Sequence, residues 1–89
     1  MIRQEVTIVN ALGLHARAAA HFVQMAGHFR SRIEVSRDSQ TADGKSILGL
    51  LALLGRQGTR LTIAADGADE QEALRALCDL VAARFGEDA

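Results

Sequence analysis

Two hydrophobic periods alternate along this 89-residue chain, and this alternation constrains its fold more than any other feature. Segments in which apolar and polar residues alternate are typical of half-buried strands, and segments with apolar residues at i, i+3, i+4 and i+7 are typical of amphipathic helices. The predicted strands cover residues 2–9, 32–36 and 60–65, with a short polar edge strand near 39–42 after a turn at Arg37 and Asp38. The predicted helices cover residues 16–27 and 47–54 and a last segment from about Asp69 to Phe85.

The resulting order is β-α-β-β-α-β-α. Strands that are exposed to solvent on one face, combined with three helices, predict an α+β fold. We expect an open-faced two-layer sandwich, in which all three helices cover the same face of a four-stranded antiparallel sheet. A chain of this length can bury one core, and no linker or repeat interrupts it, so residues 1–89 are expected to form a single domain. Several small α+β families share much of this order, so the fold alone does not identify a function.

The ends of the second and third helices carry recognisable signals. Ser46 precedes residues 47–54 as an N-cap, and Gly55 follows as the C′ residue. Asp69 and Glu72 have the spacing of a capping pair at the start of the last helix. The apolar stripe predicted for that helix consists of Leu74, Leu77, Val81 and Phe85.

The second helix is apolar on more than one side. Helical spacing predicts that Ile47, Leu50, Leu51 and Leu54 face the core, and it places Leu48 and Leu53 off that face. We therefore expect a small exposed apolar patch on this helix, of the kind that binds a partner.

Charge and composition exclude several classes of partner. Ten Lys and Arg against eleven Asp and Glu give a formal net charge of −1, which disfavours nucleic-acid binding, and the 3% aromatic content offers no stacking platform for bases. The apolar stretch 47–54 is far shorter than the roughly 20 residues that cross a bilayer, so no membrane insertion is expected. A single cysteine, Cys78, predicts a small, partly buried hydrophobe in a reduced, cytoplasmic protein.

The segment Asn10-Ala11-Leu12-Gly13-Leu14-His15-Ala16-Arg17 carries the chemistry. Asn10 and Gly13 predict a turn, and the first helix is expected to begin just after His15, which is a poor capping residue. A helix start offers the free backbone N–H groups of residues 16–18 as an anion cradle, and Arg17 adds a charge that can bind phosphate oxygens. A neutral imidazole is a nucleophile, so the segment favours capture of a phosphoryl group. The alternative is a loop histidine beside a surface arginine.

This segment and Asp43-Gly44-Lys45-Ser46-Ile47-Leu48-Gly49-Leu50-Leu51 together resemble HPr, the phosphocarrier family of bacterial phosphotransferase systems, over essentially the whole chain. The resemblance implies that His15 is phosphorylated on Nδ1 by the phosphoenolpyruvate-dependent enzyme I and passes the group to IIA proteins, with Arg17 assisting. It implies a stoichiometric carrier rather than an enzyme, and no cofactor is expected. The oligomeric state stays open, with a monomer as the default for a carrier. The chain departs from the family at Ala18, where most members have proline.

The resemblance also assigns roles to the second helix. It implies regulatory phosphorylation of Ser46 by HPr kinase/phosphorylase, and docking of enzyme I, IIA proteins and that kinase on a surface including Ile47, Leu48 and Leu51. A P-loop is excluded here, because the first glycine of that motif would fall on Ser39.

Two other functions stay open. One is a nitrogen-type regulatory phosphocarrier that uses the same His15 chemistry with other partners, and the other is a small α+β binding module without phosphotransfer. No metal site is predicted: His21 and His28 are seven residues apart, but Gly27 is expected to end the helix between them, and no other ligands complete a set.

Overall fold

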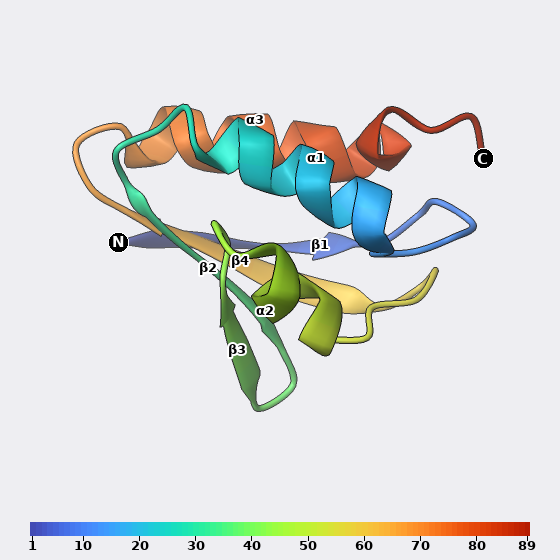
Figure 1. The fold of residues 1–89 in the computed structure, drawn as a ribbon. Helices are drawn as coiled ribbons and strands as arrows, with labels where there is room; N and C mark the ends of the chain where they lie inside the picture. Colours follow the sequence, from blue (N-terminus) through green and yellow to red (C-terminus); the bar gives the residue numbers. More distant parts are fainter.

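The computed structural model describes residues 1–89, and its order of elements is the predicted one (Figure 1). The strands are β1 (Ile2–Thr7), β2 (Arg32–Arg37), β3 (Gln40–Asp43) and β4 (Arg60–Asp66). The helices are α1 (Ala16–Ala26), α2 (Ile47–Ala52) and α3 (Glu70–Ala82), followed by a 3-10 turn at Arg84–Gly86. The strand β1 ends before Ile8, earlier than predicted, and the hairpin turn lies at Asp38 and Ser39 rather than at Arg37 and Asp38.

The four strands form one antiparallel sheet in the order β1-β4-β2-β3. Val35 of β2 lies opposite Ile63 of β4, and both side chains are buried, whereas the intervening Glu34 is not. Such alternation shows that one face of the sheet is covered and the other meets solvent. Both α1 and α3 lie over the covered face, and α2 packs against α1 and β3 (Figure 1). The predicted two-layer α+β sandwich is confirmed.

A single hydrophobic core fills the space between the sheet and the helices. Its fully buried side chains come from every layer and include Ile8, Phe22, Ile33, Leu50, Ile63 and Leu77. The predicted stripe of α3 is buried at all four positions, and Cys78 is buried beside it. Phe85, the last member of the stripe, follows the helix in the 3-10 turn rather than within it.

The prediction for α2 is confirmed at its start and wrong at its end. Ser46 caps the helix, since its Oγ accepts a hydrogen bond of 3.0 Å from Gly49 N. However, α2 ends at Ala52, and the left-handed residue after it is Leu54, with φ 55°, rather than Gly55. Helical spacing therefore does not apply to the last two leucines: Leu53 is buried, and Leu54 is 72% exposed. Ile47, predicted to face the core, is 40% exposed.

Gly55 is needed for close packing rather than for its backbone angles. A Cβ at this position would lie 2.6 Å from Ile8 Cδ1, and a Cβ at Gly13, where φ is 67°, would lie 2.5 Å from Gly55 O. Leu14 N also donates to Gly55 O at 2.9 Å. These contacts press the loop before α1 against the segment after α2, which fixes the loop that carries His15.

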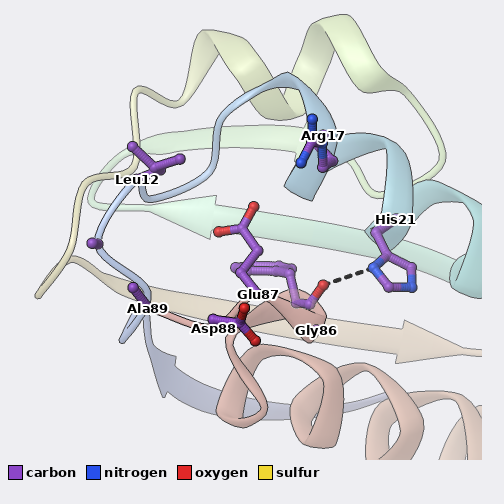
Figure 2. Close-up of a pocket in the computed structure, with 9 residues that line it drawn as sticks. Leu12, Arg17, His21, Gly86, Glu87, Asp88 and Ala89 are labelled. Atoms are coloured by element: carbon purple, nitrogen blue, oxygen red, sulfur yellow. Dashed lines mark hydrogen bonds between the residues drawn. The ribbon is translucent and has the colours of Figure 1, made fainter.

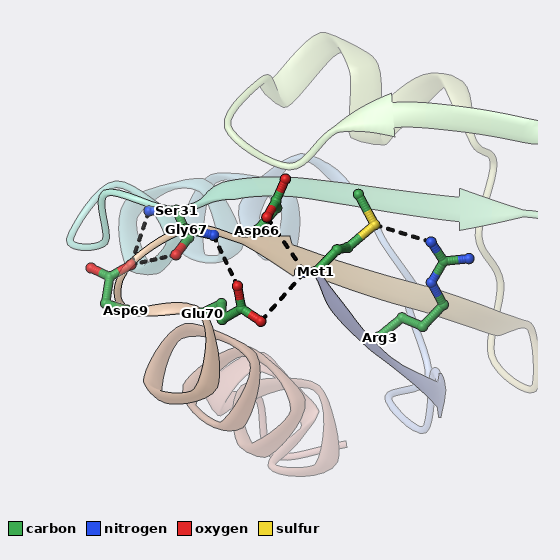
Figure 3. A network of polar contacts seen from close by, with 7 residues as sticks. All are labelled: Met1, Arg3, Ser31, Asp66, Gly67, Asp69 and Glu70. Atoms are coloured by element: carbon green, nitrogen blue, oxygen red, sulfur yellow. Dashed lines mark hydrogen bonds and ion pairs between the residues drawn. The ribbon is translucent and has the colours of Figure 1, made fainter.

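The capping pair predicted for α3 is wrong. Asp69 occupies the N-cap position, but its side chain makes no capping bond and reaches across to the loop before β2 (Figure 3). There it accepts hydrogen bonds from Arg30 N at 2.8 Å, from Ser31 N at 2.9 Å and from Ser31 Oγ. Glu72 is exposed, and Glu70 instead bonds Gly67 N. A carboxylate bonded by three donors prefers its charged form, so these bonds, the Ser31 hydroxyl foremost, lower the pKa of Asp69 to about 2.

Candidate functional site

The loop that leads into α1 is closed by Asn10, which has no exposed surface. Gly13 N donates to Asn10 O at 3.2 Å, and Asn10 Nδ2 donates to Gly13 O at 2.8 Å. This pair of bonds, together with the positive φ of Gly13, forms the turn that the sequence predicted. The turn delivers the chain to His15 at the entrance of α1.

His15 occupies the N-cap position of α1 but does not cap it. Its backbone is extended, with φ −79° and ψ 179°, and its side chain makes no capping hydrogen bond. The imidazole is partly exposed, so the ring is neither buried in the core nor turned fully into solvent. The ring is thus available for another purpose at this helix start.

The backbone around His15 leaves donors free. The N–H groups of residues 16–18 donate no hydrogen bond in the structure, and the first intrahelical bond runs from Ala19 N to His15 O at 2.8 Å. Ala16 and Arg17 are exposed, whereas Ala18 is 1% exposed. Free N–H groups at the positive end of an 11-residue helix favour a bound anion.

Arg17 stands in the first turn of α1 without a partner. Its guanidinium makes no hydrogen bond or ion pair, and it borders a pocket of about 500 Å³ whose far wall is the C-terminal segment from Phe85 to Ala89 (Figure 2). A free guanidinium beside a helix start can bind a phosphate with two hydrogen bonds. The structure therefore places the two predicted residues His15 and Arg17 at one helix entrance.

Glu87 is a site residue that the sequence analysis missed. Its Oε2 contacts His15 Nε2, and its Oε1 accepts a hydrogen bond of 2.8 Å from Asn10 Nδ2. The bonds from Asn10 and His15, aided by the charge of Arg17, lower the pKa of Glu87 below its ordinary value. An acidic residue near the end of the chain has no local pattern that distinguishes it from a solvated tail, so no sequence signal could have found it.

The other two histidines do not join His15 in a cluster. His21 Nδ1 forms a hydrogen bond of 2.7 Å with Phe85 O, which ties the C-terminal turn to α1 (Figure 2). His28 is exposed in the turn after α1. The structure contains no group of three or more His, Cys, Asp or Glu side chains arranged for a metal ion.

Of the three residues predicted for docking, the structure exposes Leu48 at 80% and Ile47 at 40%, and it half-buries Leu51 against the core. Leu12 and Leu54 are also exposed, each at 72%. Leu53, the other residue that the sequence placed off the core face, is buried instead. No helix in the structure combines the length and hydropathy needed to cross a membrane.

Comparison with known proteins gives consistent matches over most of the chain. The family model described as the phosphorylation site of the PTS HPr component matches residues 2–83. The phosphocarrier protein HPr of Cupriavidus necator is 48% identical over 87 residues, covering 98% of both chains. A crystal structure of HPr-C-His from Thermoanaerobacter tengcongensis, 44% identical, covers 100% of both chains with a TM-score of 0.95. An HPr dimer structure from the same organism is 45% identical and covers 98% of this chain and 100% of the other, with a TM-score of 0.78.

Proposed function

The chain belongs to the HPr family of phosphocarrier proteins, and we propose that His15 is the residue that carries its phosphoryl group. The observation that supports this most is the position of the imidazole beside free N–H groups and an unpaired Arg17 at the start of α1. A nucleophile, a helix N-terminus and a guanidinium together suit phosphoryl transfer, because transfer depends on positioning and on stabilisation of charge.

In the proposed step, the Nδ1 lone pair of His15 attacks the phosphorus atom of phosphorylated enzyme I. The bond from phosphorus to the donor breaks, and its electron pair remains on the donor. The N–H groups of Ala16 and Arg17 and the Arg17 guanidinium hold the phosphoryl oxygens. A nucleophile of a IIA protein then attacks the same phosphorus atom, the bond from phosphorus to Nδ1 breaks, and its electron pair returns to Nδ1. His15 is thereby regenerated, so the chain is a stoichiometric carrier rather than an enzyme. It acts as a monomer in the cytoplasm, through the small interfaces typical of transient partners.

Ala18 supports this role although it replaces the family's usual proline. Proline is tolerated in the first turn because its missing N–H has no intrahelical partner there, and Ala18 N likewise donates no hydrogen bond. The buried methyl group of Ala18 packs in the core cluster, and α1 begins at Ala16 without a proline in its first turn.

The direct test of this function is incubation of the protein with phosphoenolpyruvate, magnesium and enzyme I. We expect one phosphate per chain, labile in acid and stable in base, as a phosphohistidine is. A chain that takes up no phosphate under these conditions would instead be the binding module without phosphotransfer.

Leu48→Asp should weaken docking of enzyme I without unfolding the protein. The Leu48 side chain is 80% exposed, so its loss costs the core nothing, while a charge at the centre of an apolar contact must be desolvated when the partner binds. We expect the KM for this protein as the substrate of enzyme I to rise at least about tenfold, with kcat little changed. The matched control is Gln71→Asp, which adds the same charge on an exposed residue in the first turn of α3, a different helix from the one that carries Leu48. Equal KM values for both variants would refute docking at Leu48.

Ser46 is proposed as a regulatory phosphorylation site for HPr kinase/phosphorylase. The Ser46 side chain is half-buried at the start of α2, next to the exposed Ile47 and Leu48. A phosphate dianion there would be stabilised by the helix dipole, and it would weaken the binding of a partner that docks through an apolar surface. We expect a cognate kinase to label the wild type and not Ser46→Ala, and the labelled protein to accept phosphate from enzyme I more slowly. Labelling of Ser46→Ala equal to that of the wild type would place the phosphate elsewhere.

A further inference from the structure

The end of the chain is folded back onto the His15 loop rather than free. Arg84, Phe85 and Gly86 have φ values of 61°, 54° and 82°, which turn the chain sharply after α3. Left-handed backbone at two residues other than glycine is costly, and such strain persists only where surrounding contacts enforce it. The enforcing contacts are the buried Phe85 side chain and the bond between Phe85 O and His21 Nδ1.

Further bonds hold the last three residues. Ala11 N donates to Ala89 O at 2.9 Å, and Arg84 Nη1 donates to Asp88 O at 3.2 Å. Glu87 directly precedes these two anchored residues, and its side chain points toward the loop before α1 (Figure 2). Glu87 also lies beyond residues 2–83, the stretch that the family model matches. Its place beside His15 thus depends on the C-terminal segment that follows α3.

A chain of hydrogen bonds fixes the Glu87 carboxylate in front of the His15 ring. Asn10 uses both of its amide hydrogens, one on Gly13 O and one on Glu87 Oε1, each at 2.8 Å. The remaining oxygen of this amide, Oδ1, is buried without any partner. A buried acceptor without a partner is destabilising. The orientation of Asn10 is therefore maintained by the two hydrogen bonds that its amide donates to Gly13 O and Glu87 Oε1.

The contact between Glu87 and His15 determines which ring nitrogen is free. A carboxylate only accepts hydrogen bonds, so the ring nitrogen that faces it, Nε2, must be the one that carries hydrogen. A neutral imidazole has a single N–H, and its lone pair then lies on Nδ1. The hydrogen bonds and charge around Glu87 keep its carboxyl group ionised at neutral pH.

From this geometry we propose that Glu87 is a positioning residue that holds His15 as the Nε2–H tautomer and presents the Nδ1 lone pair to the incoming phosphorus atom. The inference rests on the proposed function for the identity of the reacting residue. As the bond from Nδ1 to phosphorus forms, the proton stays on Nε2 and the ring becomes positively charged. The carboxylate at Nε2 stabilises this charge, so Glu87 lowers the barrier to transfer without touching the phosphoryl group.

The test compares Glu87→Gln with Asp88→Asn, which removes the same charge from the next residue, whose carboxylate makes no hydrogen bond or ion pair. Glutamine has one acceptor oxygen where glutamate has two, so it cannot satisfy both Asn10 and His15. Nitrogen-15 NMR of the unphosphorylated wild type should show Nε2 protonated and Nδ1 unprotonated, with the Nε2 proton visible because it exchanges slowly with water. In Glu87→Gln the two nitrogen shifts should move toward each other and the proton signal should disappear, whereas Asp88→Asn should match the wild type.

Kinetics with enzyme I and phosphoenolpyruvate complete the test. The kcat for phosphorylation of Glu87→Gln should fall about 10- to 100-fold, with KM unchanged, because the docking surface is intact. An unchanged kcat, or nitrogen shifts equal to those of the wild type, would overturn the proposal. Wild-type protein that accepts no phosphate would instead refute the proposed function, and the NMR comparison would still decide whether Glu87 sets the tautomer.

Discussion

Replacing His15 with alanine should abolish phosphoryl acceptance and leave the fold intact. The imidazole is partly exposed and caps nothing, so its removal deletes the nucleophile without opening a cavity in the core. The measurement is incorporation of labelled phosphate from phosphoenolpyruvate in the presence of enzyme I, with circular dichroism as the check on folding. Incorporation should fall to background, because neither the free N–H groups nor Arg17 can form a bond to phosphorus.

The matched control for this variant is His28→Ala. His28 is exposed in the turn after α1 and makes no side-chain hydrogen bond, so its loss should leave both incorporation and stability unchanged. Retention of labelling in His15→Ala, or its loss in His28→Ala, would show that the acceptor is not His15.

Asp69→Ala should give the largest loss of stability among surface substitutions in this chain. The Asp69 carboxylate joins the start of α3 to the loop before β2, and its removal leaves the N–H and hydroxyl groups of the buried Ser31 without their acceptor (Figure 3). Buried donors without partners are destabilising because they have lost their bonds to water. We expect a marked drop in Tm at pH 7. The control is Asp79→Asn on the same helix, which is exposed and whose side chain bonds nothing.

The same residue predicts a dependence of stability on pH. The pKa of Asp69 is lowered from 3.8 to about 2 in the folded chain, so the unfolded state binds the proton more readily. The stabilisation is therefore complete above about pH 4 and is lost as the pH falls toward 2. The difference in Tm between the wild type and Asp69→Ala should be constant from pH 7 to about pH 4 and should shrink below it. A difference that stays the same down to pH 2 would contradict the bonds described for Asp69.

The features that the sequence predicted correctly are those set by local pattern. Alternation places Val35 and Ile63 on the covered face of the sheet, and helical spacing places Leu77 and Val81 in the core. Ser46 is recognisable as a cap because an N-cap bonds a residue only three positions away. His15 and Arg17 are two residues apart at the start of a helix, so their side chains lie close to the same helix N-terminus in any fold that keeps that helix.

The features that sequence reasoning could not provide depend on partners far away in the chain. The Asp69 carboxylate accepts hydrogen bonds from Ser31, 38 positions away, instead of capping the helix that it precedes. Glu87 reaches His15 across 72 positions through a turn held by the packing of Phe85 and by the bond between Phe85 O and His21. Leu54 is exposed because α2 ends early, and Arg37 Nη1 binds the carbonyl oxygens of Leu53 and Leu54 there, a contact that no periodicity encodes.

The proposed transfer depends most on which nitrogen of His15 accepts the phosphoryl group. Phosphorus and nitrogen-15 NMR of the protein after reaction with phosphoenolpyruvate, magnesium and enzyme I identifies that atom through the coupling between the two nuclei. A single phosphoramidate signal coupled to Nδ1 of His15 is the result predicted here. A signal coupled to Nε2, to another histidine or to no ring nitrogen would contradict it.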